Sequence, residues 1–526
     1  MDRHRAALTR GALVALPLAF LALFFVFPLW SIIETGLRGP GALETFADAG
    51  TWRVIWFTLW QAAVSTALTL AVGLPIAYAL ARFAFRGRAL LEAAVLIPFV
   101  LPTVVVGMAF GGGGASLTAM FAAHVFLNVA VVVRIVGGAW AAMDPEIEDA
   151  AEGLGARGWR RFTAVLLPLA RPAIAGATTL VFLFTCTSFG VVLLLAPAGR
   201  ATVEVEIFRR TTQLLDLPAA AVLAILQVMF VSALLVLDAV VASRGAVRQR
   251  RVPGSGSLRL PRSRGERAYL VVCVAALILL LAGPPLHLVW RSFVGPSGFT
   301  IARYTQMGSV RQGSLFAVSP LDAVGNSLRF AVAAAALALG LGLSLAVGVA
   351  DLRGRSGLWG LIALPLGVSA VTLGFGYVVA FDADPLDLRG SPWLVPLAQA
   401  VVAIPFVVRI VAPVLATIDA DLTEMAEGLG ASPWSVFTRV TLPVASPAVL
   451  VAAVFAFAVS MGEFGATSFL ARADTPTMPI AVARLLSHPG SASVGQAAAM
   501  SVLLMLVTAG VALAIGRVRV GTFGRF

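Results

Sequence analysis

The hexapeptide Ala151-Glu152-Gly153-Leu154-Gly155-Ala156 recurs without a change as Ala426-Glu427-Gly428-Leu429-Gly430-Ala431. The match extends outward on both sides, because residues 134–190 align without a gap on residues 409–465, which lie 275 positions later. Within these segments the identical pairs include Asp144 with Asp419, Trp159 with Trp434, and Pro168 with Pro443. A duplication at a constant offset indicates that the chain consists of two related halves.

The composition is that of a membrane protein. Of 526 residues, 59% are hydrophobic and 12% are charged, whereas about a quarter of a soluble domain is charged. A membrane-spanning helix needs about 20 apolar residues, and the chain has twelve such runs, near 11–33, 54–81, 89–110, 118–142, 173–195, 219–242, 268–292, 324–350, 357–380, 393–417, 447–470 and 497–516. The first run is too long for a signal peptide and is expected to be retained. These runs predict an all-α integral membrane protein with twelve transmembrane helices.

The arginines predict how these helices are oriented. Short loops rich in basic residues face the cytoplasm, and such loops hold Arg82, Arg86, Arg88, Arg157, Arg160, Arg161, Arg171, Arg353 and Arg355. We therefore expect both termini in the cytoplasm, in the inner membrane of a bacterium. The two halves, at 1–242 and 268–526, then have the same orientation and form a parallel repeat of six helices each. Residues 243–267, rich in Arg, Gly, Ser and Pro, read as a flexible cytoplasmic linker.

Several classes of function are excluded by what the chain lacks. All basic residues other than histidine are arginines, so the chain cannot contain the lysine of a phosphate-binding Walker loop. The two cysteines, Cys186 and Cys273, and the four scattered histidines show no metal-ligand spacing. We expect no cofactor, no metal and no catalytic residues in this chain. The net charge of +12 is explained by the loops without nucleic acid.

The repeated segments, at 144–172 and 419–447, resemble the signature of type I permeases of ABC importers. That signature has a Glu-Ala-Ala triplet, a Gly four residues after its last Ala, an aliphatic position and a Leu-Pro. The first copy reads Asp149-Ala150-Ala151, Gly155, Val165, Leu167 and Pro168, and the second reads Glu424-Met425-Ala426, Gly430, Val440, Leu442 and Pro443. In the first copy Asp149 replaces Glu, and in the second Met425 replaces Ala. The small residues allow close approach, the Gly turns the chain, and the Pro is expected to begin the return into the membrane.

The resemblance implies partners and a mechanism. In that family the segment is the coupling helix, which sits in a cleft of a separate ATPase subunit. It therefore implies two copies of an ABC ATPase that hold ATP and Mg, an extracytoplasmic substrate-binding protein, and ATP-driven alternating access in the lipid bilayer. An amphipathic surface loop without a partner is the alternative. A major-facilitator transporter is a rival from another class, because Asp351-Leu352-Arg353-Gly354-Arg355 is similar to one of its loops.

Other stretches narrow the substrate. Gly462-Glu463-Phe464-Gly465-Ala466-Thr467 resembles a segment shared by permeases for sulfate, molybdate, iron(III) and thiamine. The stretches 123–128, 201–208 and 215–220, with Gln227, resemble the thiamine permease most, and a fused iron(III) permease is the alternative. Glu463, with Ser188 at the equivalent place in the first half, is a candidate for the substrate pathway. A carboxylate at membrane depth should face a cavity or a partner, and a structural hydrogen-bonding role for Glu463 is the favoured alternative.

Overall fold

The computed structural model describes residues 13–517 except 40, 157, 245–257, 262, 296–297, 309–317, 350–361, 363, 366, 383–385 and 488–489. Most of the predicted linker lies outside these residues, and so does the start of the predicted ninth run, at 357–361. The described chain is almost entirely helical, with one short antiparallel pair of strands, β1 (Val294–Gly295) and β2 (Gly298–Phe299). Ten described helices are long and apolar enough to cross a membrane, or eleven if one bent pair counts as a span. The all-α transmembrane class is confirmed.

The third predicted run is the bent pair. Its two parts, 88–100 and 103–110, meet at an angle of 100°. Pro102 lies at the break, and the preceding Leu101 is extended, with φ −69° and ψ 134°. A proline disfavours helical geometry in the residue before it, so Pro102 ends one helix and the next begins at Thr103. A count of apolar residues does not reveal this bend.

The chain forms two compact units that cut across the sequence halves. Unit 1 comprises residues 1–46, 207–225 and 293–526, and unit 2 comprises 47–206 and 226–292. The helices α13 (Val203–Arg209) and α14 (Leu217–Arg244) pass from one unit into the other. Unit 2 otherwise contains α4 (Ala49–Arg82), α5 (Arg88–Ala94), α6 (Ile97–Val100), α7 (Thr103–Phe110), α8 (Leu117–Ala141), α9 (Pro145–Gly153), α10 (Gly158–Arg161), α11 (Leu167–Cys186), α12 (Gly190–Leu195) and α15 (Arg264–Phe293).

Unit 1 contains the remaining described elements. These are α2 (Phe27–Arg38), α3 (Ala42–Ala47), β1, β2, α16 (Ala302–Thr305), α17 (Pro320–Val349), α19 (Ala370–Ala380), α20 (Leu394–Leu415), α21 (Ala420–Gly428), α22 (Pro433–Val436), α23 (Leu442–Gly462), α24 (Thr467–Leu470), α25 (Met478–Leu486) and α26 (Ser491–Arg517). The stretch Ala22–Val26 before α2 and the stretch Arg210–Leu214 before α14 are π-helices. A 3-10 turn lies at Gln306–Gly308 in this unit, and another lies at Gly111–Gly113 in unit 2.

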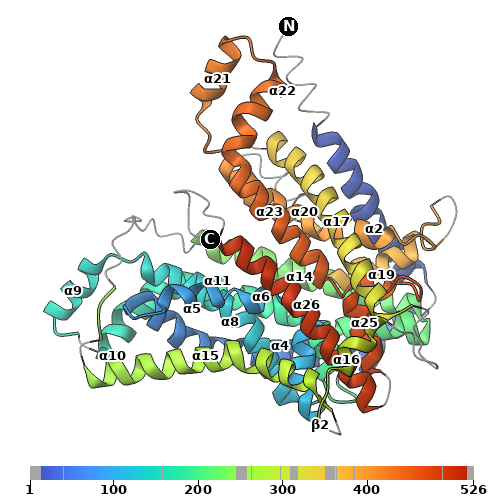
Figure 1. The fold of residues 1–526 in the computed structure, drawn as a ribbon, viewed down its shortest axis with the longest axis horizontal. Coiled ribbons are helices and arrows are strands. Elements are labelled where there is room, and N and C mark those ends of the chain that lie inside the picture. The colour runs from blue at the N-terminus through green and yellow to red at the C-terminus, as the bar shows by residue number, and fades with distance from the viewer. Residues whose placement is uncertain are drawn as a thin grey trace. The chain divides into compact units, whose positions relative to one another are not determined.

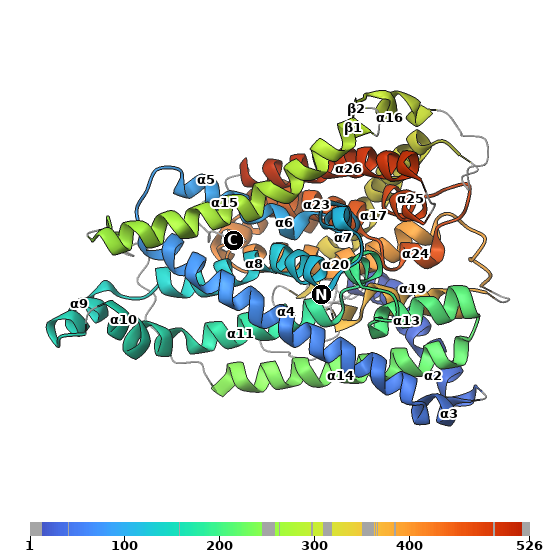
Figure 2. The same cartoon turned by 90° about the horizontal axis from the view of Figure 1, so that it is seen from below.

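Each unit is built around the same group of three helices. In unit 2, α4, α8 and α11 pack on one another, and in unit 1 the corresponding α17, α20 and α23 do so (Figures 1 and 2). A glycine allows the first two helices of each group to approach closely. A Cβ added at Gly73 would lie 2.8 Å from Cβ of Val132, and one at Gly342 would lie 2.7 Å from Cβ of Val407. Small residues at such crossings let membrane helices pack without a hydrophobic driving force.

The first helix of each sequence half packs in the compact unit of the other half. In unit 1, α2 lies against α19, and the Tyr377 hydroxyl donates to the Phe24 carbonyl at 2.7 Å. In unit 2, Leu270 and Leu277 of α15 join the core of α4 and α8, and the Tyr269 hydroxyl donates to the Pro75 carbonyl at 2.7 Å. Unit 1 therefore includes a helix from the predicted half 1–242, and unit 2 includes one from 268–526.

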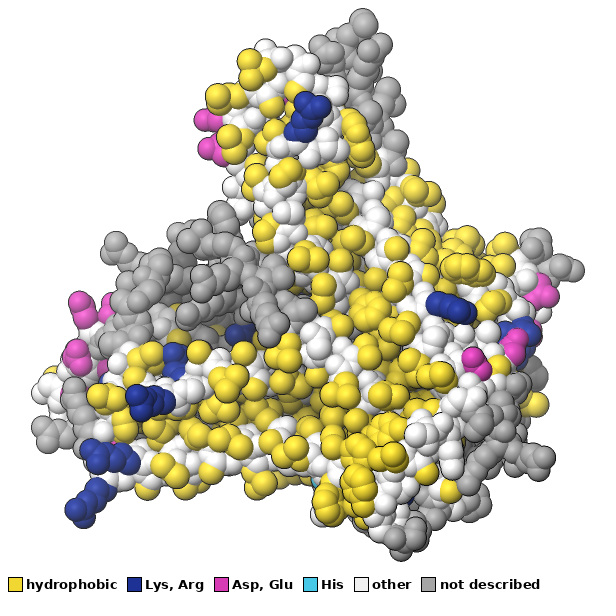
Figure 3. Space-filling view, in the orientation of Figure 1, with side chains coloured by type: hydrophobic (Ala, Val, Ile, Leu, Met, Phe, Trp, Pro, Cys, Tyr) yellow, Lys and Arg dark blue, Asp and Glu magenta, His cyan; other side chains and the backbone are white. Residues whose placement is uncertain are grey.

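Charged and apolar side chains separate on the surface. In Figure 3 hydrophobic side chains cover most of the visible face of the long helices, while Asp and Glu side chains lie over α9, over α21 and at the right-hand edge. Exposed Trp56, Val272, Leu279 and Leu286 lie on the helices α4 and α15. An apolar surface of this extent fits contact with lipid rather than water.

Candidate functional site

The two copies of the repeated hexapeptide form matching helix ends. Helices α9 and α21 each begin after an aspartate, Asp144 or Asp419, whose side chain accepts a hydrogen bond from the backbone two residues later. Each helix is followed by a glycine, Gly155 or Gly430, with φ +84°. This left-handed conformation favours glycine. Two segments that are 275 residues apart therefore have the same cap at the start and the same turn at the end.

A large apolar side chain is exposed on each of these turns. Leu154 is 90% exposed and its counterpart Leu429 is 88% exposed. In Figure 2, α9 and α10 lie beyond the end of α11, and in Figure 1, α21 and α22 lie beyond the end of α23. Each leucine lies beside a glycine turn, at the end of a helix that extends away from the apolar bundle. An exposed apolar side chain in such a place is typical of a contact with a protein partner.

The predicted triplets lie on α9 and α21. Asp149 and Ala150 are exposed, whereas Ala151 is buried against its own unit. Glu424 and Met425 are exposed in the second copy, and Ala426 is partly buried. The last alanine of each triplet therefore packs inward while the first two positions face outward. The other predicted members, Val165, Leu167, Val440 and Leu442, lie on the return helices.

The return helices begin earlier than expected. Pro168 and Pro443 do not begin them, because α10 and α22 already start at Gly158 and Pro433 and continue through a π-helical segment, Phe162–Leu166 or Phe437–Thr441. Directly before each proline, Leu167 or Leu442 donates its backbone N–H to a carbonyl five residues back. A proline lacks an N–H and its ring crowds the carbonyl four residues earlier, so the wider π turn accommodates it. The Leu-Pro pair shapes the helix rather than starting it.

A buried ion-pair cluster holds α9 and was missed in the sequence. The Arg82 guanidinium at the end of α4 pairs with the Glu148 carboxylate of α9. Arg161 of α10 pairs with Glu152, and its Nε lies 3.8 Å from Glu148 Oε2. Arg82, Glu148 and Arg161 are 3%, 9% and 6% exposed. In the sequence, only the spacing of Glu148 and Glu152 could have indicated this cluster, because residues one helical turn apart lie on the same face of a helix.

Ser188 lies at a helix break in unit 2 and takes part in a buried polar chain. The break separates α11 from α12. His124 Nε2 of α8 lies 3.0 Å from Ser188 Oγ, and His124 Nδ1 lies 2.8 Å from Ser65 Oγ of α4. Asn128, one turn after His124, donates to the His124 carbonyl at 2.9 Å. His124 and Asn128, from the stretch 123–128 that resembles the thiamine permease, therefore belong to one hydrogen-bond network.

Glu463 lies at the equivalent break in unit 1 and caps the next helix. Its carboxylate accepts hydrogen bonds from the backbone N–H groups of Ala466 at 2.8 Å and Thr467 at 2.9 Å, and from the Thr467 hydroxyl. Gln399, which corresponds to His124, lies 3.4 Å from that hydroxyl through its Nε2. Glu463 is buried. These bonds match the structural hydrogen-bonding role, because the carboxylate takes up the free donors at the start of α24.

Both units fix the segment after the break in the same way. Thr58 Oγ1 of α4 accepts from the Val203 N–H at 2.9 Å, and Ser327 Oγ of α17 accepts from the Met478 N–H at 2.7 Å. Val203 and Met478 are 275 positions apart and begin α13 and α25. The repeat therefore extends past the polar breaks. In unit 2 the Gln227 amide also donates to the Glu204 carboxylate.

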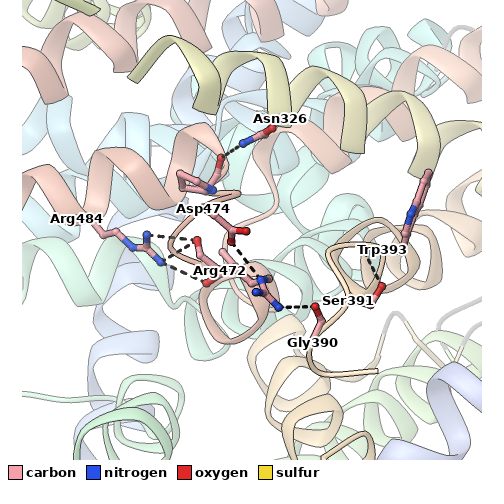
Figure 4. A network of polar contacts seen from close by, with 9 residues as sticks. Asn326, Gly390, Ser391, Trp393, Arg472, Asp474 and Arg484 are labelled. Atoms are coloured by element: carbon pink, nitrogen blue, oxygen red, sulfur yellow. Dashed lines mark hydrogen bonds and ion pairs between the residues drawn. The ribbon is translucent and has the colours of Figure 1, made fainter. Parts of the chain in front are cut away.

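A polar network holds the turn before α25 in unit 1 (Figure 4). Arg472 Nε donates to Asp474 at 3.2 Å, and its guanidinium also donates to the Gly390 carbonyl. The Arg472 guanidinium lowers the pKa of the Asp474 carboxyl. Arg484 of α25 donates to the carbonyls of Ala471 and Arg472 at 3.3 and 3.4 Å, and Asn326 of α17 donates to the Pro476 carbonyl at 3.3 Å. These bonds fix the direction in which α25 leaves the break.

Known proteins are similar to this chain in sequence. Residues 73–244 and 338–519 each match the family described as "Binding-protein-dependent transport system inner membrane component". The thiamine transport system permease protein of Salmonella typhimurium is 26% identical over 91% of this chain and 92% of its own length. A probable ABC transporter permease of Sinorhizobium fredii is 27% identical, with 92% of each chain covered. A putative 2-aminoethylphosphonate transport system permease of Salmonella typhimurium is 34% identical over 28% of this chain and 54% of its own length.

The two family matches cover most of the chain and fall one in each sequence half, as the repeat predicts. They rule out the major-facilitator alternative, whose similar loop at 351–355 lies outside the described residues. Together with ten or more apolar helices, they make this a multi-pass inner membrane protein. The chain therefore belongs to the binding-protein-dependent transport system inner membrane components, as a fused, two-domain permease of the ABC importer class.

Proposed function

We propose that this chain carries thiamine inward by ATP-driven alternating access, and that two copies of an ABC ATPase dock on α9 and α21. The observation that carries the docking is the duplicated end of these helices. Gly155 and Gly430 have the same left-handed turn, and each turn presents an exposed leucine. Two equivalent contacts suit two copies of one subunit. Under the predicted orientation both lie in the cytoplasm, as do both termini.

In the proposed complex, this chain holds no ATP and no metal and has no catalytic residues. ATP and Mg would be held by the ATPase, which agrees with the absence of lysine from the sequence. A substrate-binding protein would deliver the solute to the opposite side. The coupling residues are those of the signature: Asp149, Ala150, Ala151, Gly155, Pro168, Glu424, Ala426, Gly430 and Pro443. Closure of the ATPase pair would move the two helices together.

The proposed substrate pathway runs beside the two helix breaks at Ser188 and Glu463. Irregular backbone at membrane depth is tolerated where it is buried in protein or lines a path through it. Since both side chains already have hydrogen-bond partners, their role would be to position the broken helices. The asymmetry between Ser188 and Glu463, and between His124 and Gln399, gives the two halves different chemistry along the path.

Thiamine is supported by relatives that match nearly the full length of the chain. Iron(III) remains the alternative, because fused iron(III) permeases resemble the same segments. The test is ATP hydrolysis by the complete complex in liposomes, with its binding protein and either solute. Stimulation by thiamine and not by iron(III) is expected. Stimulation by iron(III) alone would overturn the substrate and leave the docking proposal standing, whereas ATP hydrolysis that ignores every solute would contradict solute-dependent coupling.

A further inference from the structure

The end of α4 at Arg82 is joined to α9 by buried charge. Arg82, the last residue of α4, pairs with Glu148 on the inward face of α9. Arg161 approaches the same carboxylate at 3.8 Å and pairs with Glu152 one turn further on. Arg82 is 3% exposed, so its guanidinium has little contact with water. Removal of one partner would leave a buried charge without compensation. The position of α9 therefore depends on this cluster.

The same end of α4 also holds the segment that leads into the second sequence half. The Arg259 N–H donates to the Arg82 carbonyl at 3.0 Å, and the Ala84 N–H donates to the Arg259 carbonyl at 3.0 Å. The Arg259 guanidinium lies 4.9 Å from the centre of the Phe83 ring and 2.7 Å from the Glu266 carboxylate at the start of α15. Arg82 thus contacts α9 through its side chain and the linker end through its backbone. Three elements meet at one residue.

The second half lacks two charges of this cluster, although Glu427 corresponds to Glu152. At an offset of 275, Glu148 corresponds to Thr423 and Arg161 to Val436. Neither side chain can carry a charge, so α21 cannot be held by the same ion pairs. The outward features are nevertheless duplicated, with the aspartate cap, the glycine turn and the exposed leucine present in both copies. The surface that faces a partner is therefore symmetric, whereas the attachment to the membrane helices is not.

We propose that Arg82, Glu148 and Arg161 are positioning residues that attach α9 rigidly to α4, so that the two halves transmit ATPase closure unequally. This inference rests on the proposed docking of the ATPase on α9 and α21. Closure would move α9, α4 and the linker end as one body through Arg82. At α21 the same movement would reach the bundle through the return helix and its π turn, because no ion pair joins α21 to α17 among the described residues. The first half would carry most of the coupling.

The test uses the full complex in liposomes and compares solute transported per ATP hydrolysed. Glu148→Gln, Arg82→Gln and the double variant are measured with Thr423→Val as the matched control in the second half. Glu148→Gln is expected to keep the ATPase bound and hydrolysis active while transport per ATP falls about tenfold. The double variant removes the charges of both Arg82 and Glu148, so neither is left buried without a partner. It therefore keeps the test valid if a single variant fails to fold. Its loss is expected to equal that of Glu148→Gln, because that variant already removes the contacts of the carboxylate with both Arg82 and Arg161 and leaves no ion pair for Arg82→Gln to break.

The outcomes separate the two proposals. Unchanged transport per ATP in the double variant would overturn the positioning role, and so would an equal loss in Thr423→Val or multiplied losses in the double variant. If the wild-type chain failed to bind the ATPase at all, the proposed docking would be overturned and this inference with it. Loss of ATPase binding in Glu148→Gln alone would also contradict the inference, since Glu148 faces inward and is not expected to contact the partner.

Discussion

At the scale of single residues, the buried carboxylate of Glu463 is accounted for by a helix end. Glu463 was identified in the sequence because a carboxylate in an apolar run is costly without a partner. Its partners are the donors of the very next turn, Ala466 and Thr467. That arrangement could have been suspected from Glu463-Phe464-Gly465-Ala466, since a residue that accepts bonds three and four positions ahead is a cap. Glu463 thus bonds to the backbone of the turn that follows it.

We expect Glu463→Ala to destabilise the purified protein by about 1–3 kcal/mol, because it leaves buried N–H donors without an acceptor. The apparent KM for the transported solute should change less than about twofold, since the carboxylate bonds to the backbone N–H groups of Ala466 and Thr467 and to the Thr467 hydroxyl. Thermal unfolding in detergent and transport in liposomes are the measurements. Ser188→Ala, at the equivalent break, is the matched control and should lose only about 0.5–1.5 kcal/mol. An unchanged Tm together with a raised KM would contradict the capping role and favour a direct contact with solute.

At the scale of elements, apolar runs and the repeat predicted most of the spans but not how they bend or begin. The run at 89–110 is one stretch of hydrophobic residues, yet Pro102 bends it by 100°. The return helices start at Gly158 and Pro433. These starts were not predicted, because the first turns of the helices are polar and do not belong to an apolar run. The two segments proposed to bind the ATPase were found from the repeat and the permease signature, and their Gly155 and Gly430 have the left-handed turn that glycine adopts easily. Glu148 was missed because burial of a charged side chain depends on a partner, Arg82, that is distant in sequence.

The docking of an ATPase on α9 and α21 predicts the effect of a bulky charge on these turns. Gly155→Arg together with Gly430→Arg should abolish co-purification of the ATPase while leaving the amount of protein in the membrane unchanged. Both glycines have open space around them, so the new side chains would project from the surface and meet only a partner. Gly199→Arg is the matched control, because Gly199 has φ +79° and equally open surroundings but lies outside both segments. Normal co-purification of the double variant, or equal loss in the control, would refute the docking sites.

At the scale of the whole molecule, the repeat and the compact units divide the chain at different places. The repeat divides the chain at the linker, as the two family matches at 73–244 and 338–519 do. The compact units instead exchange α2 and α15, each of which packs in the unit of the other half. Hydropathy could not predict this, because every lipid-spanning helix is apolar and its choice of neighbour depends on contacts such as those of Tyr377 and Tyr269. A single chain keeps the exchanged helices together.

This exchange predicts how the chain responds to being cut after Gly254, between the two sequence halves. The fragments 1–254 and 255–526 should co-purify when they are produced together, and each should be degraded or aggregate when produced alone, because each compact unit then lacks a helix of its core. Size-exclusion chromatography of tagged fragments, alone and together, is the measurement. Tyr377→Phe in the split pair removes only the bond to the Phe24 carbonyl and should weaken recovery without abolishing it, at about 0.5–1.5 kcal/mol. A fragment that is stable and monodisperse alone, with no affinity for the other, would show that the sequence halves fold independently and that the exchange of α2 and α15 is not required.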